Sequence, residues 1–354
     1  MKHSRMTGGL CALALCLGLL TGCGENREAA GLATDLQLTD GQVTAFTVQA
    51  ADGQKTRILL DETTHVIAPV TGMEQEDFLA GPDTDVTVLA TWEPADWNRF
   101  WQDGKMVTAY RARWVEITGY RTDVTVPLSD GTRAACWQMG RDTAYRLPDG
   151  PELLRVSEPA GPGHAYASGV GSLEDLPAAA QQVEAYYARQ GLLYDENAAL
   201  EDAFAVYRQA GAPADFRAAE LGQETLPTAA SEQVLYFATS VSWVTPDAQG
   251  YEARTGAAFD KKTGARIPAE ELFTVPWEEA APALLDLAQI SDPALQAEMA
   301  AALTPDCLLF YPEHLELYFS PGTLPSQTYT NIASLDYEKL RTLLQDWAVP
   351  VQKT

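Results

Sequence analysis

The sequence predicts a small all-β domain on the N-terminal side, followed by a larger α+β domain. Short runs rich in Val, Thr, Tyr and Trp, separated by Asp-Gly turns, dominate the chain up to about residue 119. Helical periodicity begins only after residue 172, and from there strands and helices mix without a regular strand–helix–strand alternation. The chain has 354 residues, which is more than one hydrophobic core usually holds, so two domains are expected.

The N-terminal residues predict export and attachment of a lipid. A basic start with Lys2 and Arg5 precedes the apolar run GGLCALALCLGLL of residues 8–20, a pattern typical of a secretory signal. The run is too short for a membrane-spanning helix, which needs roughly 20 residues. It ends in the stretch LTGC, which resembles the lipobox of bacterial lipoproteins. The resemblance implies that residues 1–22 are a signal peptide and that Cys23 carries the lipid. An ordinary secretory signal with a chance cysteine is the alternative.

The lipid would place the protein at the cell membrane, exposed outside the cytoplasm. The chain has 49 acidic and 24 basic residues, a net charge of −25. Such acidity argues against nucleic acid as a partner and favours either a well-solvated exterior protein or one that meets a basic partner. Beyond Cys23, only Cys136 and Cys307 remain after the signal, and a disulfide between them stays an open alternative.

The N-terminal β-rich region begins after a polar stretch, residues 23–35, which we expect to be a flexible tether. Asp-Gly pairs at residues 40–41 and 52–53 predict two hairpins within residues 36–60. Residues 83–92 and 105–117 add two longer strands. The order of these elements resembles small OB-like barrels of exported bacterial proteins, and we assign residues 36–119 to such a domain.

An aromatic cluster interrupts this region. Trp92, Trp97, Phe100 and Trp101 lie within ten residues, the last three at the i, i+3, i+4 spacing of a helix face. This spacing favours a short helix that closes the barrel mouth with large apolar side chains. The alternative is a stacking platform for wall sugar or for a partner, which makes Trp97 and Trp101 candidate binding residues.

The second region, residues 120–354, alternates between strand and helix patterns. A run that opens at Ser172 and stops before Gly191 has the signals of a helix start and a helix end. The final helix is expected to present Leu343, Leu344 and Trp347 on the same face as Leu340. We expect strands in residues 122–139, 142–156, 233–244, 251–260 and 307–321, and helices in residues 172–191, 196–211, 276–289, 292–303 and 336–348.

Two blocks in this region carry a resemblance. GAAFDKKTGARIPAEELF (residues 256–273) and LLFYPEHLELYFSPGTLPSQTYTNIASLDYEKL (residues 308–340) look like the extracellular C-terminal domain of RsiV-type anti-sigma factors. That domain also accompanies PdaC-type polysaccharide deacetylases. The resemblance assigns a structural role to the motif residues Phe259, Asp260, Thr263, Gly264, Tyr318 and Phe319.

The resemblance implies exterior sensing or wall association, since RsiV-type proteins bind lysozyme, which is strongly basic. This chain departs from the pattern because it lacks a cytoplasmic anti-sigma segment and a Gly-Gly-Ala-His stretch before the first block. Tyr329, in the loop PSQTYTN of the second block, is a further candidate for partner contact.

No coherent catalytic set is found in the sequence. His65, His164 and His314 lie far apart and in no metal-binding pattern, and His164 with Ser168 lacks the G-x-S-x-G elbow. We therefore predict no catalytic residue, no metal and no cofactor. The expected function is a non-catalytic module that binds or senses a basic extracellular protein or a cell-wall glycan. An accessory or enzyme of wall polysaccharide modification, or a small-ligand carrier, are the alternatives.

Overall fold

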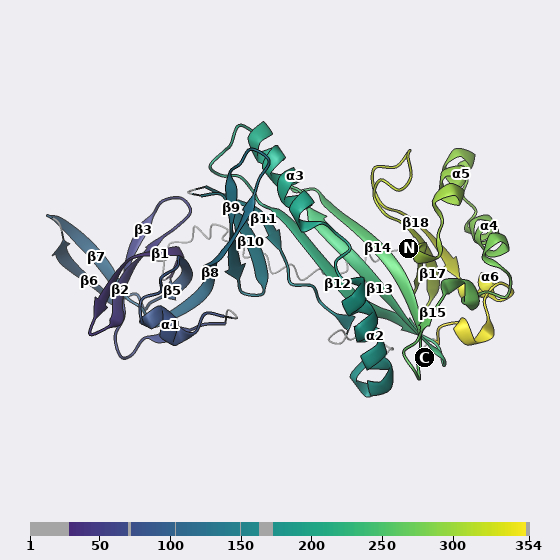
Figure 1. The fold of residues 1–354 in the computed structure, drawn as a ribbon, viewed down its shortest axis with the longest axis horizontal. Coiled ribbons are helices and arrows are strands. Elements are labelled where there is room, and N and C mark those ends of the chain that lie inside the picture. The colour runs from purple at the N-terminus through teal and green to yellow at the C-terminus, as the bar shows by residue number, and fades with distance from the viewer. Residues whose placement is uncertain (1–27, 70–71, 103, 149, 163–172, 352–354) are drawn as a thin grey trace, which may run out of the picture. The chain divides into compact units, whose positions relative to one another are not determined.

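The protein is a mixed α+β fold built mostly from strands, with a large sheet (Figure 1). The computed structural model describes residues 28–69, 72–102, 104–148, 150–162 and 173–351. These divide into two compact units. The first consists of the described residues up to Ile67 together with Val88–Glu116, and the second of Ala68–Thr87 together with the chain from Ile117 onward. Strands β5 and β8 contribute residues to both units.

The first unit is all-β, as its composition predicts. Its strands follow the order β5-β1-β2-β3-β7-β6, in which β3 and β7 are parallel while β1–β2, β2–β3 and β6–β7 are antiparallel. Phe46, Ile58 and Val88 are fully buried and form its core. The strands are β1 (Glu28–Thr39), β2 (Gln42–Gln49), β3 (Lys55–Leu59), β4 (His65–Ile67), β5 (Val86–Thr91), β6 (Trp97–Gln102), β7 (Lys105–Arg111) and the start of β8 (Trp114–Pro127).

Strands of the first unit do not close into a barrel within the described residues, which corrects the expectation of a closed OB-like barrel. The chain after β5 forms an additional hairpin, and β6 pairs along one side of β7 while β3 pairs along the other. Strand β6 therefore ends the strand order on this side, with no further strand paired to it in the described structure.

The short helix expected over the aromatic cluster is also wrong. Trp97 to Gln102 form strand β6, paired with β7 from Trp97↔Tyr110 to Gln102↔Lys105. The tight turn before β7 contains Gly104 at φ +74°, which a glycine adopts without strain. The hairpin partner outweighs the helical spacing of the aromatic residues, because strand preference depends on the neighbouring strand.

Part of the expected tether is a strand. Strand β1 begins at Glu28, and Leu32, Ala33 and Thr34 pair with Gln49, Val48 and Thr47. Backbone pairing with β2 orders a stretch whose composition alone reads as a polar linker. The signal peptide and Cys23 lie outside the described residues.

The second unit contains a long sheet in the order β8-β9-β10-β11-β12-β13-β14-β15. Its neighbouring strands are antiparallel except β11 and β12, which are parallel. The strands after β8 are β9 (Arg133–Met139), β10 (Asp142–Arg146), β11 (Glu152–Val156), β12 (Ala219–Ala230), β13 (Val234–Val244), β14 (Gly250–Asp260) and β15 (Arg266–Ile267).

The sequence of β13 is almost continuously apolar, as expected for a strand that is buried on both faces. On one face, Phe237 packs with Val183 of α2 (Pro177–Gln190), and Val241 joins the cluster of Phe204 from α3 (Glu196–Gln209). On the other face, Tyr236 joins the cluster that contains the C-terminal elements. Figure 1 shows α2 and α3 along the long strands. These helices end as predicted, near Gly191 and Gly211, although α2 begins at Pro177 rather than at Ser172.

A three-stranded antiparallel sheet, the three helices α4 to α6 and several short elements complete the second unit. The sheet has the order β16-β17-β18, and its buried face joins α4 in the largest apolar cluster. The elements are β16 (Leu308–Phe310), β17 (His314–Phe319), β18 (Asn331–Asp336), α4 (Trp277–Ala288), α5 (Pro293–Ala302), α6 (Tyr337–Leu340), the short α1 (Gln75–Leu79) and the 3₁₀ turns Leu173–Asp175, Ala269–Leu272, Pro305–Cys307 and Asp346–Ala348.

The long C-terminal helix expected over residues 336–348 is wrong, because α6 stops at Leu340. Backbone hydrogen bonds to the segment after β15 replace the helix: Thr274 N–H donates to Leu343 O, and Gln345 N–H donates to Leu272 O. Leu343 and Leu344 are buried as expected, but through this bridge rather than on a helix face.

Cys136 and Cys307 are both unpaired and half-buried. Burial is the main cause that raises the pKa of the Cys136 thiol. No helix in the described part of the chain is long and apolar enough to cross a membrane.

Candidate functional site

Three aromatic rings stack at one end of the β13–β14 hairpin in the second unit. Trp243 and Tyr251 lie directly opposite each other in the antiparallel register, and their ring centroids are 5.5 Å apart with an interplanar angle of 17°. Tyr329, from the loop between β17 and β18, stacks on Tyr251 with centroids 6.1 Å apart and an angle of 11°. We call Trp243, Tyr251 and Tyr329 the aromatic ladder. Its outermost residue, Tyr329, is 63% exposed.

Polar groups surround the ladder. The Tyr251 hydroxyl donates to Gln249 Oε1 at 2.7 Å, and Thr245 Oγ1 donates to the Gln249 carbonyl at 3.1 Å and to Asp247 Oδ1. Offset stacks of this kind contribute about 0.5–1.5 kcal/mol beyond their buried area, so they hold the rings in one arrangement. A planar sugar face, another aromatic ring or a cation can stack on such a surface.

The loop that carries Tyr329 is fixed to strand β14 by two hydroxyl groups. Tyr318 Oη donates to the Glu252 carbonyl at 2.9 Å, and Thr330 Oγ1 donates to the same oxygen at 3.4 Å. Tyr318, the residue before last of β17, thus anchors the start of the loop that carries the exposed Tyr329. The aromatic ladder is consequently built by residues from β13, β14 and the β17–β18 loop.

A charged cluster continues from this anchor along β14. Arg254 donates from Nη2 to Glu252 Oε2 at 2.7 Å and from Nη1 to the Tyr311 hydroxyl at 3.1 Å, and its guanidinium lies 5.5 Å from the Tyr318 ring centroid. Burial lowers the pKa of Arg254, but the hydrogen bond and charge of Glu252 outweigh it, so the pKa is raised overall. Burial raises the pKa of Tyr311 and of Tyr318. Arg254 therefore stays charged and the tyrosines stay neutral.

His314 and Glu316 form the far side of this cluster. His314 Nε2 lies 3.1 Å from Glu316 Oε1, and the His314 ring stacks on Tyr311 at 5.2 Å. Arg254 Nε and Glu316 Oε2 are buried atoms without a hydrogen-bond partner in the described structure. Among the described residues, no three His, Cys, Asp or Glu side chains group in a way that could hold a metal ion.

The first family block forms a turn and a close contact with α2. Asp260 Oδ1 accepts from Lys262 N–H at 3.1 Å and from Thr263 N–H and Oγ1, both at 2.8 Å. The hydroxyl and amide of Thr263 are the main causes that lower the pKa of Asp260. Gly264 has φ +71°, and a Cβ there would lie 2.4 Å from the Ala179 carbonyl of α2. Phe259 and Phe319 are fully buried, so both contribute to the hydrophobic core of the second unit.

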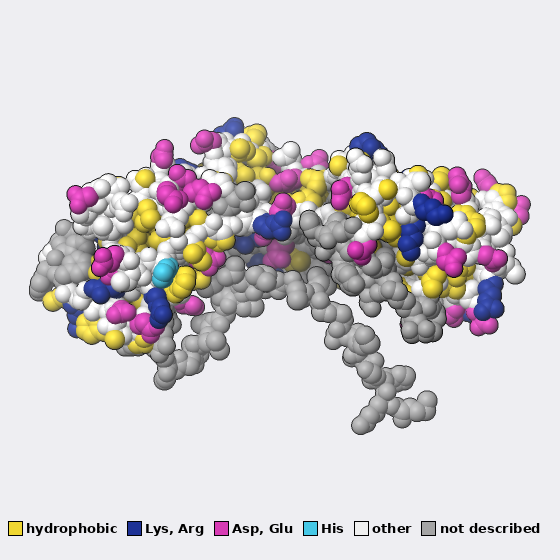
Figure 2. Space-filling model, turned by 90° about the horizontal axis from the view of Figure 1, so that it is seen from below, with side chains coloured by type: hydrophobic (Ala, Val, Ile, Leu, Met, Phe, Trp, Pro, Cys, Tyr) yellow, Lys and Arg dark blue, Asp and Glu magenta, His cyan; other side chains and the backbone are white. Residues whose placement is uncertain are grey.

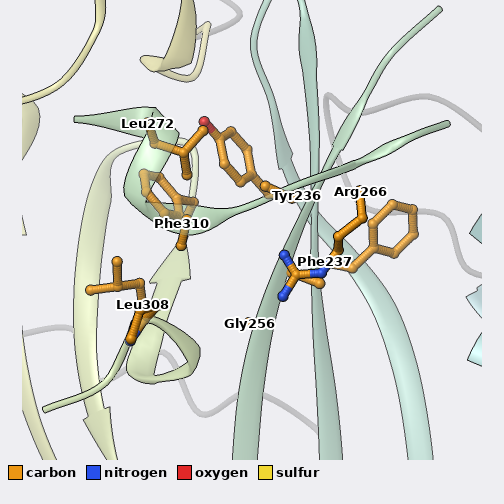
Figure 3. Close-up of a pocket in the computed structure, with 11 residues that line it drawn as sticks. Tyr236, Phe237, Gly256, Arg266, Leu272, Leu308 and Phe310 are labelled. Carbon is orange, nitrogen blue, oxygen red and sulfur yellow. The ribbon is translucent and has the colours of Figure 1, made fainter. Parts of the chain in front are cut away.

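A cavity behind β14 is too small for an organic ligand. Figure 3 shows Tyr236, Leu272 and Phe310 on one side of it and Phe237 and Arg266 on the other. Its volume of about 10 Å³ is close to that of a single water molecule. Ligand pockets usually measure several hundred Å³. This cavity therefore has no room for a small organic ligand, whereas an open hollow beside Pro282 and Pro293, between α4 and α5, is larger at about 420 Å³.

The candidate residues Trp97 and Trp101 belong to the first unit, whereas the aromatic ladder belongs to the second. Trp97 is 46% exposed, and the Arg99 guanidinium lies 5.1 Å from its ring centroid. Trp101 belongs to β6, but its side chain is outside the described residues. His65 stacks on Trp114 at 4.7 Å and is not near two other metal-ligating side chains within the described structure.

The sequence pointed to Tyr329 but missed its two ladder partners. Trp243 and Tyr251 become neighbours only through the β13–β14 register, which the turn at residues 245–249 fixes. The signal in the sequence was one aromatic residue on each side of the turn between two predicted strands. Figure 2 shows acidic side chains scattered over the visible face of the molecule rather than gathered in one patch. Charge alone therefore does not mark the site.

The chain was compared with known families, curated proteins and solved structures. No family model matches, and no curated protein matches. A DUF3298 family protein from Pseudomonas aeruginosa PAO1 is 14% identical, with a TM-score of 0.31 over 50% of this chain and 83% of that one. A member of the same family from Bacteroides fragilis is 12% identical, with a TM-score of 0.35 over 65% of this chain and 93% of that one. The chain is thus similar to DUF3298-type structures.

Proposed function

We propose that this protein is a non-catalytic binding or sensing module of the cell envelope. In this proposal a lipid on Cys23 holds the body at the outer face of the cell membrane, and the aromatic ladder contacts the partner. The observation that carries it is the stack of Trp243, Tyr251 and Tyr329, which ends in a ring with most of its surface in solvent. The partner is a basic extracellular protein or a cell-wall glycan.

The physical argument rests on preorganisation. Tyrosine and tryptophan dominate the energetics of many interfaces because they bury a large area at small entropic cost. Here the two hydroxyl anchors at the Glu252 carbonyl hold the Tyr329 loop before any partner arrives. The net charge of −25 would also accelerate the approach of a cationic protein and offer carboxylates to its Lys and Arg side chains.

The fold-level part of the proposal has its own support. The first unit has the strand order β5-β1-β2-β3-β7-β6 with β3 and β7 parallel, and the chain passes from β7 into β8, beside β5; this parallel pair supports an OB-like assignment. At the passage, Ala112 N–H donates to Leu59 O and Arg113 N–H donates to Thr91 O. We propose an open OB-like arrangement for this unit and an RsiV/PdaC-like domain for residues 120–354.

A binding assay with matched variants tests the function. The full-length protein, purified from membranes in detergent, is titrated with lysozyme and, separately, with soluble peptidoglycan fragments. Tyr329→Ala is expected to weaken binding to one of these probes about tenfold or more, since interface tyrosines often contribute over 1 kcal/mol. Val206→Ala changes a surface residue of α3 that is 42% exposed and should leave the affinity unchanged.

Three results would each contradict a part of the proposal. Equal affinities for the wild-type protein and Tyr329→Ala with both probes would remove the ladder from the contact. Hydrolysis or deacetylation of the peptidoglycan fragments by the purified protein would instead identify an enzyme. A lipid-free, unprocessed Cys23 in the native protein, found by mass spectrometry, would overturn the anchor independently of both.

A further inference from the structure

Few residues separate Cys23 from the first strand of the folded body. Strand β1 begins at Glu28, only five residues after Cys23. An extended chain gains at most about 3.3–3.6 Å per residue, so these five steps span no more than roughly 18 Å. Whatever path the chain takes between them, the first unit begins within that distance of the residue that would carry the lipid.

The strand register shows which part of the first unit lies at this end. Leu32 pairs with Gln49, the last residue of β2, and a Cβ on Gly31 would lie 2.2 Å from the Gln49 carbonyl oxygen. The β2–β3 turn, residues 50–54, therefore lies beside the start of β1. The β1–β2 turn at Asp40 and Gly41 lies at the opposite end of the same hairpin, since Thr39 pairs with Gln42.

The separation of the two turns follows from strand geometry. Gln42 and Gln49 are the first and last residues of β2. At about 3.3 Å per residue, seven steps along a strand place their Cα atoms roughly 23 Å apart. This separation exceeds the reach of the chain between Cys23 and Glu28, so a short anchor distinguishes the two ends.

The two ends also differ in charge. The sequence AADGQK of residues 50–55 is small and balances Asp52 against Lys55, and Glu28 at the start of β1 adds one carboxylate to this end. The opposite end carries Asp40, Asp61 and Glu62, and only Asp61 has an arginine partner in the described salt bridges, Arg111 at 3.0 Å. Membrane surfaces are negatively charged when they contain anionic lipids, which repel carboxylates. The balanced turn is the end that fits beside lipid headgroups.

We propose that the first unit stands directly on the membrane, with the β2–β3 turn facing the outer lipid headgroups and the Asp40–Gly41 turn directed away from them. The inference rests on the proposed lipid anchor at Cys23. It replaces a body that moves freely on a flexible tether with one whose orientation the anchor restricts. The bilayer surface is the partner of this turn.

Fluorescence quenching in vesicles tests this orientation. Gln54 and Gln42 are exposed residues beside the two turns, and Gln54→Cys and Gln42→Cys provide matched labelling sites. Cys136 and Cys307 are replaced by serine, and a lipidated Cys23 does not react with a thiol label. The lipidated full chain is reconstituted into vesicles of phosphatidylglycerol and phosphatidylethanolamine that carry a headgroup-attached quencher. Circular dichroism of each labelled protein checks that it is folded.

The label at residue 54 is expected to lose most of its fluorescence, and the label at residue 42 to lose little. Equal quenching at both sites, or stronger quenching at residue 42, would overturn the orientation while a lipid found on Cys23 by mass spectrometry leaves the anchor in place. Absence of the lipid, with no quenching at either site, would overturn the anchor and the orientation together.

Discussion

Gly256 lies at a close approach between the long sheet and the three-stranded sheet. It pairs with Ala238 within the sheet, and it faces β16 on its other side. A Cβ at this position would lie 1.9 Å from the Leu308 carbonyl oxygen and 3.0 Å from the Leu308 carbonyl carbon. Both neighbours are backbone atoms of a strand that is itself paired with β17 through Leu308↔Leu317. Neither side can rotate away from an added methyl group.

The Gly256→Ala variant is therefore expected to destabilise the second unit strongly. Adding a methyl group to a packed site typically costs about 1–3 kcal/mol, and a clash between two paired strands belongs at the upper end of that range. For 150–250 residues, 1 kcal/mol shifts the melting temperature by about 2–4 °C, so a decrease of roughly 6–12 °C is expected. Differential scanning calorimetry of the full-length protein measures this decrease in melting temperature.

A control on the same strand separates the clash from other effects of alanine. Gly250 begins β14 and has no atom within 4 Å of its ideal Cβ position. Gly250→Ala should change stability by no more than about 0.5 kcal/mol, as expected for an open surface position. The reasoning is refuted if Gly256→Ala melts at the wild-type temperature, or if both variants lose the same amount.

The remaining predictions concern the first family block. Asp260→Ala should destabilise the protein by about 1–2 kcal/mol in urea titrations, because Thr263 loses its charged acceptor. Because the pKa of Asp260 is lowered in the folded protein, its carboxylate stabilises the fold at pH values above the ordinary pKa of 3.8. This stabilisation is lost as the pH falls through the folded pKa, so the stability of the variant should decrease less in acid than that of the wild type. Gly264→Ala should unfold at lower urea than Gly322→Ala, because both have positive φ but only Gly264 faces a neighbouring backbone. Equal midpoints would contradict this.

Much of the second unit is predictable from local sequence signals. The helix that ends near Gly191 and the strand over residues 233–244 both follow from periodicity and turn residues, since each buries a face that its pattern specifies. The expected C-terminal helix failed because its leucines serve a backbone bridge with Leu272 and Thr274, some 70 residues away. No local pattern encodes such a partner.

The first unit shows the same limit. Trp97 and Phe100 keep a helical spacing, yet the hairpin partner β7 makes them a strand. The polar stretch after Cys23 reads as a linker, yet it enters strand β1 at Glu28, and β1 pairs with the end of β2 from Leu32 onward. In both cases a backbone ladder decided the structure, and the identity of the pairing strand is a long-range property that composition does not carry.

The loop that displays Tyr329 also protects the edge of the long sheet. Strand β15 pairs only with Ala258 and Phe259, which leaves the rest of β14 without a strand on that side in the described structure. Unpaired edges invite aggregation unless something covers them. Tyr318 and Thr330 cover the Glu252 carbonyl, and the same two contacts bring Tyr329 onto Tyr251. The contacts that cover this part of the β14 edge are therefore the same ones that hold Tyr329 against Tyr251 with most of its surface in solvent.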